Sequence, residues 1–237
     1  MKKLLIFGDS FGTEKAEHPR QSSTLRFHDY LRDRKYFSSI ETYAIGGADL
    51  WSQFKKFSSI YTGSEEVILF ETSPGRVTLN TDTLHGRYVG LPEAEYKIIK
   101  DSSNPVHVYM RDYFRYLMRD DYDKFLNRSM IEKIKLLCPH ILIIPCFTDS
   151  VTTIISGNTK LAVLGSVTLN ENEIFLKQGK ITDSRLYIDL RKNHLTEENH
   201  VVLAEQILEY YKFGIPLNFY KYKLPYLSDF DKYFIKV

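Results

Sequence analysis

A serine near the start of the chain and a histidine near its end could together perform acyl transfer. Ser10 lies between Gly8 and Gly12, directly after an apolar run, and His194 lies in a polar segment far along the chain. A serine hydroxyl attacks a carbonyl carbon when a base removes its proton, and imidazole has a suitable pKa near neutrality. Asp189 is the candidate acid that would hold the ring in the correct tautomer. These residue types predict a nucleophilic serine centre.

The segment from Gly8 to Gly12 has other interpretations. Gly, Asp and Ser are common turn formers, so on its own the segment is more simply explained as an ordinary polar turn. The glycines also allow a tight turn that presents Ser10 at the carboxyl end of a strand, where open α/β sheets bind ligands. A phosphate-binding turn is the third interpretation, but the glycine-lysine pattern of a P-loop is absent and the His194 segment stays unexplained.

Three segments together resemble the SGNH (GDSL-type) hydrolase superfamily. They are Gly8-Asp9-Ser10-Phe11, the turn Ala44-Ile45-Gly46-Gly47-Ala48, and Asn193-His194-Leu195-Thr196 followed by Asn199-His200, in the family's order. The resemblance implies Ser10 as nucleophile and His194 as base. It also implies an oxyanion hole made by the backbone N–H groups of Ser10 and Gly47 and by a side chain after the third strand.

The acid of the predicted triad departs from the family pattern. The family aspartate lies three residues before the histidine, where this chain has Arg191, whereas Asp189 lies five residues before His194. Three arrangements stay open: Asp189 reaches the ring, a backbone carbonyl replaces it, or the centre is a Ser-His dyad.

The segment after the third strand departs as well. The family's Gly-x-Asn-Asp block is replaced by Glu71-Thr72-Ser73-Pro74, which puts Ser73 in the place of the asparagine. A hydroxyl can donate one hydrogen bond, so we predict Ser73 as the third oxyanion donor, with the Thr72 hydroxyl as the alternative. Asp9, Thr72 and Arg76 are the predicted substrate contacts, Arg76 for an anionic substrate, although a surface salt bridge explains Arg76 equally well.

His200 is the rival of His194 as the base. It falls near the first turn of the last predicted helix, where capping or packing also explains it, and geometry decides between the two histidines. The other histidines lack such a context and are expected in surface or core roles: His18, His28, His85, His107 and His140.

Alternating strand and helix patterns are expected to position these residues. Apolar runs predict buried strands at residues 4–7, 40–45, 67–70 and 140–147, and a short fifth strand at 186–188. Helical spacing predicts helices at residues 22–36, 48–61, 124–137 and 196–212. Repeated βα units indicate an α/β fold, a three-layer flavodoxin-like sandwich with a central parallel sheet of about five strands.

Residues 1–237 are expected to form a single domain, and two parts of it depart from the pattern of repeated βα units. Residues 77–123 are an inserted region, expected as a cap or lid beside the active site and equally explained as a surface decoration. Residues 213–237 are an aromatic C-terminal extension, expected to pack on the domain, with a partner-binding tail as the alternative. Aromatic residues of the insertion suit stacking on a sugar and packing equally well: Tyr88, Tyr96, Tyr109, Tyr113, Phe114 and Tyr116.

The composition is ordinary for a globular protein, with 43% hydrophobic and 26% charged residues. The net charge of +2 and the absence of a long Lys/Arg block argue against a nucleic-acid partner. No apolar stretch reaches the length of a membrane span, and the first one is shorter than that of a signal peptide. Cys138 and Cys146 lack metal-ligand spacing and are expected as buried free thiols.

The leading hypothesis is a serine esterase that cleaves an acyl ester, acetyl first of all, on a carbohydrate or a lipid-like molecule. Such an esterase needs no metal or organic cofactor. A cytoplasmic location is expected by default, and later assembly into a virion stays open. The alternative is the same fold without catalysis, a binding or structural module such as a glycan-recognising component of a virion or cell surface. The presence of both Ser10 and His194 favours the enzyme. The oligomeric state stays open.

Overall fold

The computed structural model describes residues 1–9, 11–14, 25–46, 48–74, 119–146 and 197–218. It also describes the isolated positions 103, 108, 112, 116, 150–151, 155–156, 159–160 and 195. The predicted lid at 77–123 and the predicted fifth strand at 186–188 lie outside these residues, apart from a few positions at the end of the lid.

Four parallel strands form the central sheet in the order β2-β1-β3-β4. They are β1 (Leu4–Phe7), β2 (Ile40–Thr42), β3 (Glu66–Glu71) and β4 (Leu142–Pro145). The two central strands are buried on both faces, which is why their sequences are nearly continuous apolar runs. Four of the five strands predicted from the sequence are confirmed, β1 with the predicted ends and the other three with ends shifted by at most three residues.

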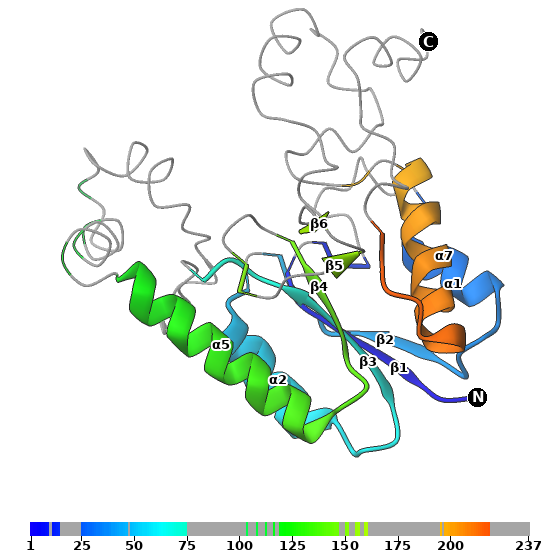
Figure 1. Cartoon of the computed structure of the whole chain (residues 1–237), viewed down its shortest axis with the longest axis horizontal. Coiled ribbons are helices and arrows are strands. Elements are labelled where there is room, and N and C mark those ends of the chain that lie inside the picture. The colour runs from blue at the N-terminus through cyan, green and yellow to red at the C-terminus, as the bar shows by residue number, and fades with distance from the viewer. Residues whose placement is uncertain are drawn as a thin grey trace, which may run out of the picture.

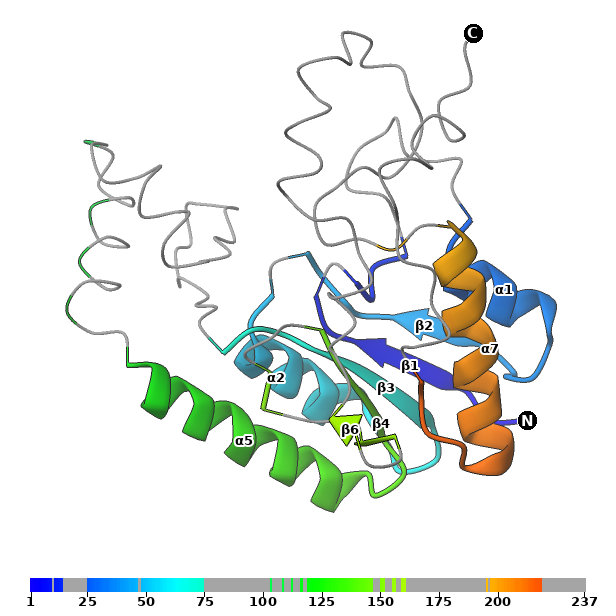
Figure 2. The same cartoon turned by 45° about the horizontal axis from the view of Figure 1, so that its top comes forward.

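Helices cover both faces of the sheet. Figures 1 and 2 show α1 (Phe27–Asp33) beside α7 (Glu197–Phe213) on one face, and α2 (Leu50–Ile60) beside α5 (Asp120–Leu137) on the other. The predicted α/β/α layering is therefore confirmed. A separate pair of short antiparallel strands, β5 (Ile155–Ser156) and β6 (Thr159–Lys160), follows β4. None of the described helices is long and apolar enough to cross a membrane.

The alternation of side chains along the strands divides the core in two. The α1/α7 face of the sheet contributes Leu4, Ile6, Ile68, Phe70, Leu142, Ile144 and Cys146. The α2/α5 face contributes Leu5, Phe7, Val67, Leu69, Ile141 and Ile143. Because side chains of a strand alternate between faces, the same pattern assigns a face to each residue just beyond a strand end. Both cysteines are buried and free, as predicted.

Helix α5 buries only part of its apolar surface. The stripe that packs on the sheet is formed by Asn127, Ile131, Ile134 and Cys138, at helical spacing. Phe125 is apolar but 63% exposed. The helix carries apolar residues around more than half of its circumference, so its sequence alone does not identify which stripe contacts the sheet.

Candidate active site

Gly8 ends β1 in a conformation that requires glycine. Its φ is +132°, and a Cβ at this position would lie 2.5 Å from the carbonyl oxygen of Phe70. The backbone therefore leaves β1 in direct contact with β3. The polar residues that follow lie at the carboxyl edge of the sheet, where α/β folds bind their ligands.

A tight turn follows, from Asp9 to Gly12. The backbone N–H of Gly12 donates to the carbonyl oxygen of Asp9 at 3.0 Å, and the N–H of Phe11 donates to Asp9 Oδ1, also at 3.0 Å. Asp9 is fully buried. In the sequence, Ser10 and Phe11 are the two residues between the ends of this turn, and Ser10 itself lies outside the described residues.

Two of the three segments that carry the resemblance contact each other. The N–H of Ile45, in the turn after β2, donates to the carbonyl oxygen of Gly8 at 3.0 Å. A Cβ at Gly12 would lie 2.8 Å from the Cβ of Ala44. The turn after β1 and the turn after β2 are thus packed as one unit, although Gly47 lies outside the described residues.

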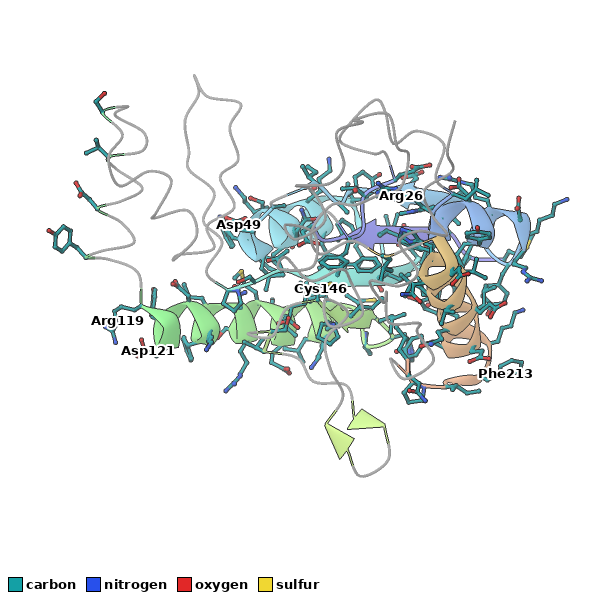
Figure 3. The ribbon with its side chains drawn as sticks, turned by 90° about the horizontal axis from the view of Figure 1, so that it is seen from above. Arg26, Asp49, Arg119, Asp121, Cys146 and Phe213 are labelled. Atoms are coloured by element: carbon teal, nitrogen blue, oxygen red, sulfur yellow. The ribbon has the colours of Figure 1, made fainter. Side chains whose placement is uncertain are left out.

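Helix α2 holds the start of the same turn. Asp49, labelled in Figure 3, is the N-cap of α2, and its Oδ1 accepts from the backbone N–H of Ser52 at 2.7 Å. One turn further along, the buried Gln53 accepts a hydrogen bond from the N–H of Gly8 through Oε1 at 3.0 Å. Without this acceptor a buried backbone donor would lose its partner.

Helix α1 holds the far end of the turn. The Arg26 guanidinium, labelled in Figure 3, donates to the carbonyl oxygen of Thr13 at 2.7 Å and to its Oγ1 at 3.1 Å. The His28 Nε2 lies 3.0 Å from the carbonyl oxygen of Gly12. A carbonyl oxygen only accepts, so Nε2 carries the proton of His28 and Nδ1 carries the lone pair.

The imidazole of His28 is neutral at ordinary pH. Burial lowers the pKa of His28 to about 3, and the nearby charge of His200 acts in the same direction. Its Nδ1 is buried and has no hydrogen-bond partner in the described structure.

The last residue of β3 and the two that follow it have buried polar side chains. Glu71, Thr72 and Ser73 are all 3% exposed or less. Glu71 accepts a hydrogen bond from the backbone N–H of Val151, beyond β4, so it ties the segment after β4 to the end of β3. Thr72 Oγ1 is buried without a hydrogen-bond partner among the described residues. A buried hydroxyl in that state carries a desolvation cost.

The first turn of α7 is packed against α1. Asn199 and His200 are both buried, and the His200 ring lies nearly parallel to the Phe27 ring with 6.1 Å between centroids. The structure thus places His200 between α1 and α7, in the core cluster of that face.

Five of the predicted site residues lie outside the described residues, so their roles stay predictions: Ser10, Gly47, Arg76, Asp189 and His194. Three others are described and buried, one after β1 and two after β3, and their predicted roles stay predictions: Asp9, Thr72 and Ser73. The sequence did not predict that Gln53, Arg26 and His28 would hold the turn, because their hydrogen-bond partners are distant in the sequence. Among the described residues, no group of three or more His, Cys, Asp or Glu side chains is placed to hold a metal ion.

No family model matches the chain, and no curated protein matches it. Similar solved structures include an acetyl xylan esterase, with 14% identity and a TM-score of 0.39, covering 87% of this chain and 98% of that one. A G-D-S-L family lipolytic protein from Veillonella parvula has 12% identity and a TM-score of 0.33, covering 90% and 99%. A GDSL-like lipase from Parabacteroides merdae has 13% identity and a TM-score of 0.28, covering 61% and 58%.

The two lipolytic structures are of the GDSL type by name, the family that the sequence segments of this chain resemble. All three TM-scores are below 0.5.

Proposed function

We propose that this chain is a serine hydrolase of the esterase type, with Ser10 as its nucleophile. The observation that carries the proposal is the turn from Asp9 to Gly12, which buried side chains hold from two helices, Gln53 from α2 and His28 from α1. An ordinary polar turn leaves its groups in water. A nucleophile has to be held within a fraction of an ångström of its reactive position, and such buried support serves that purpose.

The proposed reaction has two halves. Ser10 Oγ attacks the ester carbonyl carbon while His194 takes its proton, and the tetrahedral intermediate expels the alcohol, which leaves with that proton. Water, deprotonated by His194, then attacks the acyl-serine, which releases the carboxylic acid and regenerates the Ser10 hydroxyl. Asp189 is proposed to orient His194. No metal or organic cofactor takes part in these steps.

The oxyanion of the intermediate is proposed to bind to the N–H groups of Ser10 and Gly47 and to the Ser73 hydroxyl. Asp9 is the residue whose proposed role changes. Its Oδ1 accepts from the N–H of Phe11 within the turn, and it is fully buried, so we propose that it shapes the turn instead of contacting substrate. Arg76 is retained as the proposed contact for an anionic substrate.

The proposed substrate is a small-molecule or carbohydrate ester, and an acetyl ester is the first to test. Hydrolysis of 4-nitrophenyl acetate by the wild type should exceed that of Ser10→Ala and His194→Ala by a factor of about 1000 or more. Matched controls are Ser59→Ala and His140→Ala, because both residues are exposed and lie on helix or loop surface away from the turn. A serine-directed phosphonate should label Ser10, as located by mass spectrometry.

Two results would contradict the proposal. Equal rates for the wild type and Ser10→Ala, with both proteins folded, would exclude Ser10 as the nucleophile. A folded wild type that neither hydrolyses a panel of acetylated sugars nor takes the phosphonate at Ser10 would favour the alternative, a glycan-binding module, which glycan-array binding would then test.

A further inference from the structure

His28 is a buried histidine that the proposed reaction does not use. It is fully buried on α1, its ring lies 3.8 Å from the Phe27 ring between centroids, and its Nδ1 has no hydrogen-bond partner in the described structure. Burying an imidazole with one nitrogen unsatisfied costs stability, and a leucine would pack in this apolar cluster without that cost. What a leucine would lose is the hydrogen bond from His28 Nε2 to the carbonyl oxygen of Gly12.

That hydrogen bond acts on the far end of the turn. Gly12 donates its own N–H to the carbonyl oxygen of Asp9, so Gly12 is held by its N–H from within the turn and by its carbonyl from α1. The next residue, Thr13, is held by Arg26 from the same helix. The near end is fixed at Gly8 by Gln53 and by contact with Phe70.

We propose that His28 is a positioning residue for the nucleophile, acting through the Gly12 carbonyl. This inference rests on the proposed function, since it assumes that Ser10 reacts. Neutral His28 donates from Nε2, fixes the orientation of Gly12 and so holds the Asp9 to Gly12 turn in one conformation. It touches neither the substrate nor the reacting atoms.

The test compares His28→Leu with His28→Gln. Leucine removes the donor, whereas the glutamine amide carries an N–H₂ at about the same distance from the backbone and can donate to Gly12. In His28→Leu, kcat should fall by a factor of about 10 to 100 while KM changes by less than about twofold, because a misplaced nucleophile slows the chemical step. His28→Gln should recover most of kcat.

Asn127→Leu is the matched control. Asn127 is also buried, its Nδ2 also has no hydrogen-bond partner among the described residues, and it lies on α5 on the opposite face of the sheet. The same kind of change there should leave kcat at the wild-type value. Hydrogen exchange of the peptide that contains Gly8 to Thr13 provides a readout that needs no activity, and it should be faster in His28→Leu than in the wild type or His28→Gln.

The outcomes separate the two proposals. An active wild type with unchanged kcat and unchanged exchange in His28→Leu would overturn the positioning role of His28. Loss of kcat in His28→Leu without recovery in His28→Gln, and with equal loss in Asn127→Leu, would also overturn it, since general packing would then explain the effect. An inactive, unlabelled wild type overturns the proposed function itself, and unchanged exchange in His28→Leu would then show that His28 does not hold the turn either.

Discussion

Acidification is expected to destabilise the folded chain through His28. Burial, and secondly the charge of His200, lower the pKa of His28 from the ordinary 6.5 to about 3. In the unfolded chain a histidine titrates near ~6.5, so below that pH the unfolded state binds a proton that the folded state does not. The contribution of neutral His28 to the free energy of unfolding is fully present above pH ~6.5, and it is lost progressively as the pH falls toward about 3. Between about pH 7 and about pH 5 the loss amounts to about 2 kcal/mol.

The measurement is a series of urea unfolding curves between those two pH values, followed by far-UV circular dichroism. The free energy of unfolding of the wild type should fall by about 2 kcal/mol more than that of His28→Leu, which lacks the titrating group. His140→Leu is the control, because His140 is exposed and therefore solvated in the folded and unfolded states alike. This comparison does not depend on enzymatic activity.

One result would refute the reasoning. If the wild type and His28→Leu lose the same free energy of unfolding over this range, within about 0.5 kcal/mol, then His28 gains a proton in the folded state as readily as in the unfolded one. The imidazole would then be accessible to water, and the hydrogen bond from its Nε2 to the Gly12 carbonyl would not be a stable feature of the turn.

Three further predictions concern the ends of β1 and β3. Gly8→Ala should lower the free energy of unfolding by about 3 kcal/mol or more, because it adds a backbone contact at 2.5 Å to an unfavourable φ. Gly63→Ala, with φ +101° and open space around it, should cost only about 1 kcal/mol, and equal costs in thermal unfolding would contradict the close-contact argument. Thr72→Val should leave stability equal or higher by up to about 1 kcal/mol, because it removes a buried hydroxyl without a partner. Ser73→Ala should lower kcat by about 100-fold if Ser73 donates to the oxyanion. A loss of kcat in Thr72→Val alone would assign that role to Thr72.

The central strands were predictable because residues buried on both faces of a sheet have to be apolar at each position. The predicted strand at Leu4 to Phe7 has the same ends as β1. Helix α1 was predicted over residues 22–36 but spans Phe27–Asp33. At its start the backbone N–H of Arg26 donates to Asp29 Oδ2 at 2.9 Å, and Lys35 follows its end with φ +50°. Neither arginine as N-cap nor lysine at positive φ is a usual helix boundary, so the sequence carried no signal for either end.

The two turns beside each other at the carboxyl edge could be predicted from the sequence, whereas the side chains that hold the first turn could not. The strand-turn pattern and the family resemblance placed the Gly8 turn beside the turn after β2, and the structure joins Gly8 to Ile45. Gln53 is separated from its partner Gly8 by 45 positions, and His28 from Gly12 by 16. Such contacts follow from how helices dock on the sheet, which local sequence patterns do not encode.

The segment from Glu71 to Pro74 shows why the family pattern fails after β3. Glu71 takes the place of a glycine, and its carboxylate is committed to the N–H of Val151, so it supports the segment after β4. The alternation along β3, if continued past its end at Glu71, predicts Ser73 on the same face as Glu71 and Thr72 on the face of α1 and α7. The two hydroxyls are therefore predicted to lie on opposite faces of the sheet. Comparing Thr72→Val with Ser73→Ala therefore locates the oxyanion as well as its donor.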